Sequence, residues 1–367
     1  MKQPKQILIR GPNWTGDLIM ATPGFRALRA GYPQARISLH LRPSLVPLLV
    51  GAPWFDEVLP LTSHAGGFPA LLSEARSLRP RGFDLGLCLP DSFSAALLMR
   101  AAGVAHIVGY RRGWRGALLH QSVPVPRKAG RRLMMAREHH VLGLVEATGC
   151  PRQGTHLELF VTEAETGEAS RALEERGISR DSSLALLAPG ASYGPSKLWP
   201  AESFAAVGDA LAEAGASVAV IGTEAERELS RRLTAGMRAP VADLCGELSL
   251  STLKAVVRRA SVLVCNDAGA RHLAAAFGVP CVVLMGPTAL EKTNMNLERV
   301  KVFSADVSCR PCYRRECPID HRCMTRIPAE QVASEALPAL AADAATHWRG
   351  ATLRAWAPAE VRAWSAA

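Results

Sequence analysis

The sequence predicts an α/β protein made of two doubly wound, Rossmann-like domains. In both halves of the chain, short apolar runs alternate with helix-length amphipathic segments, a pattern typical of parallel sheets covered by helices. Several of these runs are continuously apolar, as expected for strands that are buried on both faces. At 367 residues the chain is long enough to form two domains, each with its own core.

The first series of elements begins with a strand at residues 6–10. A polar turn follows at residues 11–16, and a helix is expected from residue 17 to about residue 30 because apolar residues recur there at helical spacing. Further strands are expected at residues 35–41, 57–59, 84–89 and 106–109. We assign this series to an amino-terminal domain of residues 1–165.

The second series begins with a strand at residues 183–187 and a polar loop at residues 188–200. Helices are expected at residues 201–214 and 251–259, and strands at residues 217–221, 242–244 and 261–265. We assign residues 166–345 to a carboxyl-terminal domain, since charged, helix-prone residues separate the two series. The tail, residues 346–367, is expected to pack back on the first domain as a helix.

Bulk properties limit the setting in which the protein works. No apolar run approaches the roughly 20 residues needed to span a bilayer, and the first residues lead into a strand rather than a signal peptide. We therefore expect a cytosolic protein whose nine cysteines do not form a disulfide framework. The formal net charge of +10 suggests an anionic partner: a phosphorylated glycolipid, nucleic acid or an anionic membrane face.

The most informative segment is a buried strand that ends in Asn266, Asp267, Ala268 and Gly269, with His272 three residues later. Ligands of open α/β sheets bind at the carboxyl ends of the strands. Gly269 allows the backbone to approach a ligand closely, and the amides of the following helix favour a diphosphate, whereas the Asp267 carboxylate suits sugar hydroxyls. A plain turn in which Asp267 caps the helix is equally compatible with these residues.

Two other charged residues suit chemistry on a nucleotide sugar. Lys197 lies in a loop with flexible glycines and hydroxyl donors, among them Gly190 and Ser192, as a phosphate leaving group requires. Asp17 lies at a helix start, where the macrodipole favours a carboxylate that can accept a proton from an attacking hydroxyl. Two domains facing a cleft would bring Asp17 opposite Asp267. A helix-capping Asp17 and an exposed loop Lys197 remain open as alternatives.

Arginines and cysteines form two further clusters. The basic stretch at residues 111–137 suits either an anionic ligand or an ordinary solvated face. Cys309, Cys312, Cys317 and Cys323 share one polar loop, and their spacing suits a tetrahedral structural site for zinc or iron. Reduced cysteines without a metal, or a disulfide formed after purification, are the alternatives.

Four motifs occur in a fixed order along the chain: residues 11–17 followed by Pro23, residues 189–200, residues 266–272 and residues 286–288. Together they resemble those of glycosyltransferase family 9, the ADP-heptose:lipopolysaccharide heptosyltransferases. The resemblance extends through nearly all of the chain. The second motif, in which Pro-Gly-Ala is followed by Gly-Pro-Ser-Lys, is most similar to that of the heptosyltransferase II branch.

The resemblance implies the GT-B fold and an inverting transfer of L-glycero-D-manno-heptose from ADP-heptose to heptosyl-Kdo2-lipid A. It implies that Asp17 is the catalytic base and that Lys197 binds the diphosphate. The implied donor-binding residues are Gly190, Ser192, Lys197, Glu224, Asp267, Ala268, Gly269 and His272, and the implied acceptor-binding residues are Asn13, Arg111, Arg112 and Arg115. Ala268 replaces a hydroxyl residue of some relatives, so only its backbone amide is expected to bind there.

The resemblance also implies the partners. These are an ADP-heptose donor, a phosphorylated Kdo-lipid A acceptor and peripheral contact with the cytosolic face of the inner membrane, where Trp114 could lie at the interface. No cofactor is expected in catalysis, and zinc or iron at the four cysteines would be structural. The alternatives are heptosyltransferase I or III, or a GT-B nucleotide-sugar epimerase. Nucleic acid is not expected, since basic and aromatic residues do not alternate along a strand face.

Overall fold

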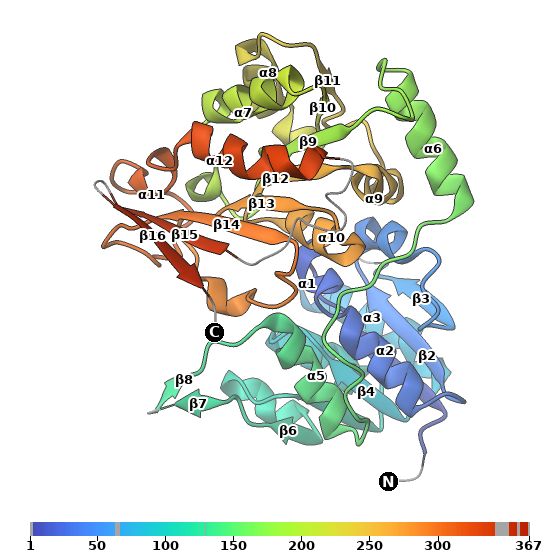
Figure 1. Cartoon of the computed structure of the whole chain (residues 1–367). Coiled ribbons are helices and arrows are strands. Elements are labelled where there is room, and N and C mark those ends of the chain that lie inside the picture. The colour runs from blue at the N-terminus through green and yellow to red at the C-terminus, as the bar shows by residue number, and fades with distance from the viewer. Residues whose placement is uncertain (1–2, 63–66, 129, 342–351, 358–359, 366–367) are drawn as a thin grey trace. The chain divides into compact units, whose positions relative to one another are not determined.

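The computed structural model describes residues 3–62, 67–128, 130–341, 352–357 and 360–365. The chain divides into two compact units. The first unit comprises Met1–Phe160 and Glu291–Met295, and the second comprises Val161–Leu290 and Asn296–Ala367. In Figure 1 the first unit runs mainly from blue to green and the second from green to red.

The division falls before helix α6 (Glu163–Glu174), whereas the predicted boundary at residue 165 lies inside this helix. Two interactions explain the difference. Thr162 and Glu165 form a capping box that starts α6 at this point. Glu165 also pairs with the buried Lys254 of α9 (Leu250–Arg259), with Nζ and Oε1 3.0 Å apart, so α6 packs with the second unit.

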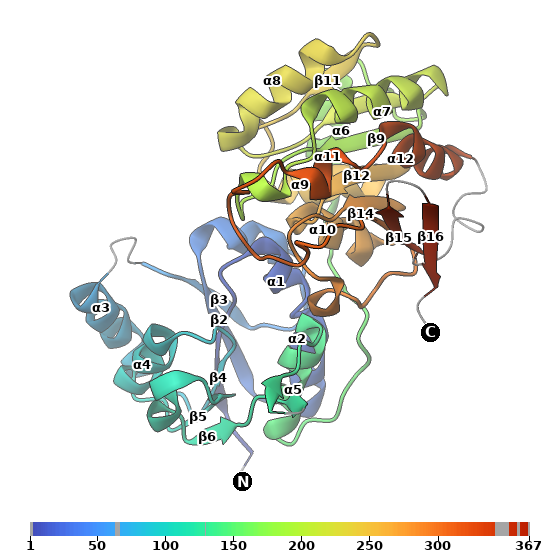
Figure 2. The ribbon, with the colours of Figure 1, turned by 90° about the vertical axis from the view of Figure 1, so that its left-hand side faces the viewer.

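The first unit contains a six-stranded parallel sheet in the order β3-β2-β1-β4-β5-β6. The strands are β1 (Gln6–Arg10), β2 (Arg36–Leu41), β3 (Glu57–Pro60), β4 (Leu85–Cys88), β5 (His106–Tyr110) and β6 (Gln121–Val123), and β7 (Arg127–Lys128) pairs separately with β8 (Arg131–Arg132). The α-helices are α1 (Thr15–Ile19), α2 (Thr22–Gly31), α3 (Phe68–Leu78), α4 (Phe93–Ala101) and α5 (Arg137–Ala147), and short 3-10 helices are η1 (Pro43–Leu49), η2 (Arg79–Arg81) and η3 (Gly113–Leu118). Helices α3 and α4 lie on one side of the sheet, and α2 and α5 lie on the other (Figure 2).

The prediction of a single helix from residue 17 to residue 30 is wrong, because two helices, α1 and α2, occupy this segment. Pro23 lacks an amide hydrogen, and a proline is tolerated in the first turn of a helix but not in its interior. A new helix therefore begins at Thr22, with Pro23 in its first turn. The Thr22 hydroxyl donates to the carbonyl of Ile19 (2.8 Å), which satisfies one acceptor at the end of α1.

The second unit contains a sheet in the order β11-β10-β9-β12-β13-β14-β15-β16. Its strands are β9 (Leu184–Ala188), β10 (Ser217–Val220), β11 (Val241–Asp243), β12 (Val262–Asn266), β13 (Cys281–Leu284), β14 (Val300–Ala305), β15 (Thr352–Ala357) and β16 (Glu360–Ser365), of which only β16 is antiparallel to its neighbour. Besides α6 and α9, the α-helices are α7 (Ala201–Glu213), α8 (Arg227–Gly236), α10 (Gly269–Phe277), α11 (Arg322–Thr325) and α12 (Ala329–Ala336). The 3-10 helices from this part of the chain are η4 (Pro195–Lys197), η5 (Glu224–Glu226), η6 (Leu290–Lys292) and η7 (Leu337–Leu340).

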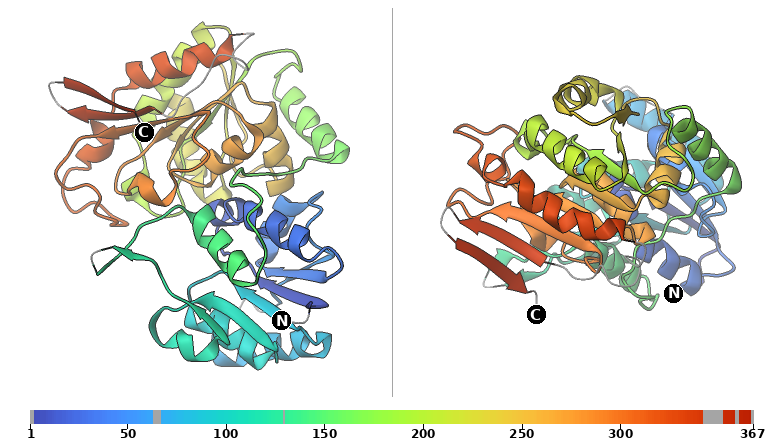
Figure 3. Two further views of the ribbon diagram at one scale, coloured as in Figure 1. Left: turned by 60° about the horizontal axis from the view of Figure 1, so that its bottom comes forward. Right: turned by 45° about the horizontal axis from the view of Figure 1, so that its top comes forward.

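The described residues of the tail form two strands rather than the predicted helix. Its strands β15 and β16 extend the second sheet beside β14 (Figure 3). The sequence contains a signal for this arrangement, because polar and apolar residues alternate at residues 352–355, a period typical of strands. Pairing also covers the backbone groups that β14 would otherwise expose as an edge strand. The other residues of the tail lie outside those described.

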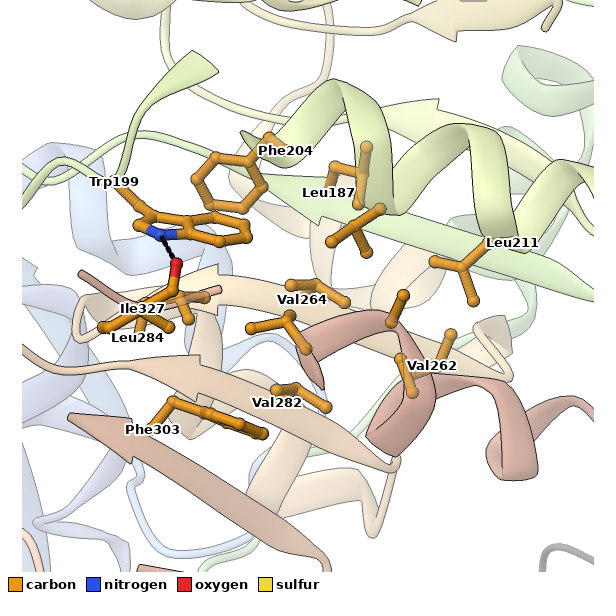
Figure 4. Close-up of a cluster of buried hydrophobic side chains, with 14 of the residues drawn as sticks. Leu187, Trp199, Phe204, Leu211, Val262, Val264, Val282, Leu284, Phe303 and Ile327 are labelled. Atoms are coloured by element: carbon orange, nitrogen blue, oxygen red, sulfur yellow. Dashed lines mark hydrogen bonds between the residues drawn. The ribbon is translucent and has the colours of Figure 1, made fainter. Parts of the chain in front are cut away.

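A buried apolar cluster lies between the second sheet and helices α7 and α12 (Figure 4). The rings of Trp199 and Phe204 meet edge to face, with centroids 5.0 Å apart. The indole nitrogen of Trp199 donates to the carbonyl of Ile327 (3.2 Å), so this large side chain has both apolar and polar partners. Trp199 thereby anchors the polar loop that follows β9 in the core.

Both parallel sheets have the strand order of a Rossmann fold. The order reverses between β1 and β4 in the first unit and between β9 and β12 in the second. In such sheets, ligands bind outside the carboxyl ends of the strands at this switch point. The fold therefore indicates that a ligand would bind at the loops that follow these four strands. Within the described residues, every helix is too short or too polar to cross a membrane.

Candidate functional site

The switch point of the second unit is held together by Asn266, the last residue of β12, which is fully buried. Its amide nitrogen donates to the carbonyl of Pro189 (2.6 Å), and its amide oxygen accepts from the backbone nitrogen of Trp199 (3.2 Å). These two partners stand near opposite ends of the loop that contains Lys197. Asn266 therefore fixes this loop against the end of β12.

The carboxylate of Asp267 lies at the centre of the site. Its Oδ2 accepts from Lys197 Nζ (2.7 Å) and from the Thr288 hydroxyl (2.8 Å), and its Oδ1 accepts from Arg271 Nη1 (3.0 Å). Burial alone would raise the pKa of Asp267. The charges of Lys197 and Arg271, with the hydrogen bonds from Lys197 and Thr288, instead hold this pKa well below its usual range. Asp267 is therefore a buried anion.

The helix-capping alternative for Asp267 is wrong. The cap of α10 is Ala268, in extended conformation, and no side chain caps this helix. The α10 amides near Gly269 therefore remain available at the site. Two cations, one anion and a helix amino terminus give this edge of the sheet a positive potential that suits a diphosphate.

Lys197 is not an exposed loop lysine. Its side chain is only 12% exposed, and Nζ also donates to the backbone carbonyl of Asp267 (2.6 Å). The same nitrogen lies 5.3 Å from the centre of the Tyr193 ring, a cation–π contact. Lys197 is thus held in one place beside Asp267.

His272 lies on α10, one residue after Arg271, and is buried. Burial disfavours the imidazolium, and the charge of Arg271 repels it, so the pKa of His272 is lowered to about 3. The imidazole is therefore neutral near pH 7. It can donate or accept a hydrogen bond in the turn that follows β12, but it adds no charge there.

The remaining donor-binding candidates line the ends of β9 and β10. Ser192 is exposed, and the exposed Glu224 pairs with Arg227 (Oε2 to Nε, 2.6 Å). An ideal Cβ at Gly190 would lie 1.9 Å from Glu226 Oε1, so a larger residue there would displace the Glu226 carboxylate. Glu226 was not among the predicted residues, although the Thr-x-x-Glu capping box that starts at residue 223 was a signal for it.

Asp17 lies in the first turn of α1, at the switch point of the first unit. The helix cap is Trp14, so the helix-capping alternative for Asp17 is wrong. Arg137 of α5 approaches Asp17, with Nε and Oδ1 3.8 Å apart. Asn13, in the same loop, accepts from Nη2 of the buried Arg10 (2.7 Å).

The three arginines expected to bind the acceptor differ in position. Arg111 and Arg112 are exposed, and Arg112 Nη1 lies 3.4 Å from Asp91 Oδ2. Arg115 is 1% exposed, and its guanidinium donates to the backbone carbonyls of Tyr110 (2.9 Å), Pro90 and Ser92. We therefore correct the expectation for Arg115, which supports loops inside the first unit and is not exposed to an acceptor.

Asp91 was missed although it follows β4, the second strand of this switch point. Burial would raise its pKa. His140, whose Nε2 lies 3.5 Å from Oδ1, and the charges of Arg115 and Arg137 lower the pKa of Asp91 to about 2. The signal in the sequence was a carboxylate three residues after a continuously apolar strand.

The predicted metal site is not assembled. We call residues 309–323 the cysteine loop. Cys309 and Cys312 are exposed, Cys317 is partly exposed, and Cys323 is buried. Throughout the part of the chain that the structure describes, no three Cys, His, Asp or Glu side chains are grouped as metal ligands. Cys323 instead packs near Gly286, where an ideal Cβ would lie 3.2 Å from its sulfur.

Comparison with known proteins agrees with this geometry. The family profile "Glycosyltransferase family 9 (heptosyltransferase)" matches residues 71–322. The chain belongs to glycosyltransferase family 9. Lipopolysaccharide heptosyltransferase 2 of Escherichia coli is 32% identical over 306 residues, covering 78% of this chain and 84% of the relative.

Two further family 9 relatives support the assignment. Lipooligosaccharide heptosyltransferase 2 of Haemophilus ducreyi is 27% identical over 303 residues, covering 77% of this chain and 84% of the relative. The solved structure of E. coli ADP-heptose lps heptosyltransferase II is 26% identical, has a TM-score of 0.76, and covers 90% of this chain and 96% of its own. The predicted family and its GT-B fold class are therefore confirmed.

We predict that His272 makes this family 9 protein less stable as the pH falls below about 6.5. The native imidazole stays neutral down to about pH 3, whereas the unfolded chain binds the proton near pH 6.5. The free energy of unfolding should therefore fall by up to about 1.4 kcal/mol per pH unit in this range. His272→Gln should remove that part of the slope in denaturant titrations followed by circular dichroism.

The matched control is His156→Gln, since His156 is exposed. It should keep the pH dependence of the unmodified protein. Equal slopes for the unmodified protein and His272→Gln would contradict the assignment of a neutral, buried His272.

Proposed function

We propose that the protein transfers L-glycero-D-manno-heptose from ADP-heptose to heptosyl-Kdo2-lipid A, in the synthesis of the lipopolysaccharide inner core. The observation that carries the proposal is the cluster around Asp267, where Lys197, Arg271 and the start of α10 converge at a switch point. A diphosphate needs such a combination of cations and free amides. The similarity to heptosyltransferase 2 of E. coli, over 84% of its length, supports the choice of sugar and acceptor.

In the donor site, Lys197 and the α10 amides bind the diphosphate of ADP-heptose. As the bond to the anomeric carbon breaks, negative charge grows on the departing ADP. A cation and helix amides that are already in position stabilise this charge without reorganisation. Glu224 and Ser192, at the ends of β10 and β9, contact the rest of the nucleotide.

Asp17 of the first unit accepts the proton of the attacking acceptor hydroxyl. The hydroxyl oxygen bonds to the anomeric carbon on the face opposite the departing ADP, so the anomeric configuration inverts. Arg137 lies beside this carboxylate, with its Nε 3.8 Å from Asp17 Oδ1. Arg111, Arg112 and Asn13 bind the anionic acceptor. The juxtaposition of Asp17 with the donor site during catalysis is part of the proposal.

No cofactor enters this mechanism. Lys197 and the helix amides balance the charge on departing ADP, and Asp17 accepts the proton. The zinc or iron predicted at the four cysteines takes no part in it.

Incubation with ADP-heptose should identify the acceptor. The protein is mixed with either Kdo2-lipid A or its monoheptosylated form, and the products are weighed by mass spectrometry. We expect one added heptose on the monoheptosylated acceptor alone.

Asp17→Asn and Lys197→Met should each lower kcat by about a hundredfold or more, as loss of a general base or charge stabiliser does.

The control variant is Asp181→Asn, which removes an exposed carboxylate and should transfer at the full rate. Transfer to Kdo2-lipid A alone would indicate a heptosyltransferase I, and transfer to neither acceptor would reject the donor or the reaction. Turnover of the nucleotide sugar without acceptor would favour an epimerase.

Peripheral contact with the cytosolic face of the inner membrane is the second part of the proposal. Phe68, Phe93 and Trp114 are 60%, 51% and 91% exposed, and they follow β3, β4 and β5 in sequence. The carboxyl ends of parallel strands lie at one edge of the sheet, so these side chains share that edge. Arg111 and Arg112 are exposed beside Trp114. Aromatic and basic groups together favour an anionic lipid surface.

We predict that the double variant Phe93→Ser and Trp114→Ser loses binding to vesicles that contain phosphatidylglycerol. Each aromatic side chain contributes about 1.5–3 kcal/mol when it leaves water completely, so bound protein should fall at least about tenfold in a flotation assay. Ile319→Ser is the control, because Ile319 is 60% exposed but belongs to the second unit. Equal flotation of all three proteins would contradict the assigned surface.

A further inference from the structure

The cysteine loop holds the residue that precedes Lys197. Ser196 is 3% exposed, and all its polar groups bond to this loop. Its backbone nitrogen donates to the carbonyl of Arg315 (3.0 Å), and its hydroxyl donates to the carbonyl of Arg314 (2.6 Å). Its own carbonyl accepts from His321 Nε2 (2.7 Å). The backbone next to Lys197 is therefore fixed from three directions.

Two neighbouring residues add to this contact. The Tyr193 hydroxyl donates to the carbonyl of Tyr313 (2.6 Å), and the Tyr193 ring in turn lies beside Lys197. Gly194 has φ 151°, and an ideal Cβ there would lie 2.6 Å from the carbonyl oxygen of Arg315. The close approach of the two loops thus requires glycine at this position.

The other side of the cysteine loop holds the turn that carries Thr288. The backbone nitrogens of Cys312 and Tyr313 both donate to the carbonyl of Pro287 (3.1 and 2.9 Å). Arg310 donates to the carbonyls of Gly286 (2.5 Å) and Thr288 (3.3 Å). Since Lys197 and Thr288 both bond to Asp267 Oδ2, one loop supports two partners of the same carboxylate oxygen.

The backbone of the loop has an unusual conformation at the points of contact. Among the described residues, the non-glycine residues with positive φ are Asn296, Tyr313 and His321. The last two belong to the cysteine loop, and both bond to the segment before Lys197. Such a conformation is unfavourable for residues other than glycine and persists where surrounding bonds enforce it. His321 is also held by its backbone nitrogen, which donates to Cys317 Sγ (3.3 Å).

We propose that the cysteine loop positions Lys197 for the donor diphosphate, with His321 as its main positioning residue. A carbonyl accepts the bond from His321, so Nε2 carries the hydrogen. Loss of this donor frees the carbonyl of Ser196 and lets the backbone carrying Lys197 move. The choice of a diphosphate as ligand rests on the proposed function, whereas the placement of Lys197 is tested without any substrate.

The first test is kinetic. His321→Ala should raise the KM for ADP-heptose at least about tenfold, because a displacement of about 1 Å in a charge-binding group weakens its contact with the ligand severely. The KM for the acceptor should stay unchanged. His321→Gln, whose amide can donate to the same carbonyl, should restore most of the donor affinity. Arg322→Ala is the control, since this neighbouring side chain pairs with the exposed Asp320 (2.7 Å).

The second test follows the Lys197 amine directly. The protein without substrate is acetylated with an N-hydroxysuccinimide ester, and the rate at Lys197 is measured by peptide mass spectrometry. His321→Ala should label several-fold faster than the unmodified protein, with His321→Gln and Arg322→Ala unchanged. Equal labelling of all four proteins would overturn the inference, whether or not heptose is transferred.

The two tests separate the inference from the proposed function. Faster labelling of His321→Ala in a protein that transfers no heptose would reject the function and keep the positioning role. Thermal melting checks that each variant is folded. If His321→Ala does not fold, the labelling test is done with Ser196→Ala instead, because this variant removes only the hydrogen bond from the Ser196 hydroxyl to the carbonyl of Arg314.

Discussion

The buried negative charge of Asp267 determines how the carboxyl edge of the second sheet is arranged. A carboxylate that leaves water loses several kcal/mol of hydration, so it must be surrounded by cations and donors. Its partners are Lys197 from the loop after β9, Arg271 from α10 and Thr288 from the turn after β13. Three separate segments of the chain therefore meet at this one side chain.

The same arrangement would favour a bound anion. Asp267 neutralises only one of two nearby cations, the amides at the start of α10 have no side-chain cap, and His272 remains neutral. The excess positive potential is concentrated beside a loop anchored in the core by Trp199. A rigid, positive and partly buried site of this kind is suited to stabilise the charge of a departing diphosphate.

Patterns confined to one strand and the turn after it were enough to predict both Rossmann-like sheets from the sequence. The same patterns singled out Lys197 and Asp267 as candidate site residues. Contacts between distant segments could not be predicted in this way. The hydroxyl of Ser196 finds its acceptor 118 positions away in the cysteine loop, and no pattern near Ser196 indicates that partner. The buried role of Arg115 was missed for the same reason, because a basic run looks alike whether it faces solvent or supports loops. Four cysteines at metal-like spacing likewise do not determine where each thiol points.

The most direct test of the account is the affinity for ADP, measured by calorimetry, in the unmodified protein and in Asp267→Asn. If Asp267 were only a negative charge near the nucleotide, its neutralisation would strengthen binding of an anion. If it organises Lys197, Arg271 and Thr288, the same change should weaken ADP binding at least about tenfold, because a buried cation loses its partner. Tighter or unchanged binding of ADP by a folded Asp267→Asn would contradict the account.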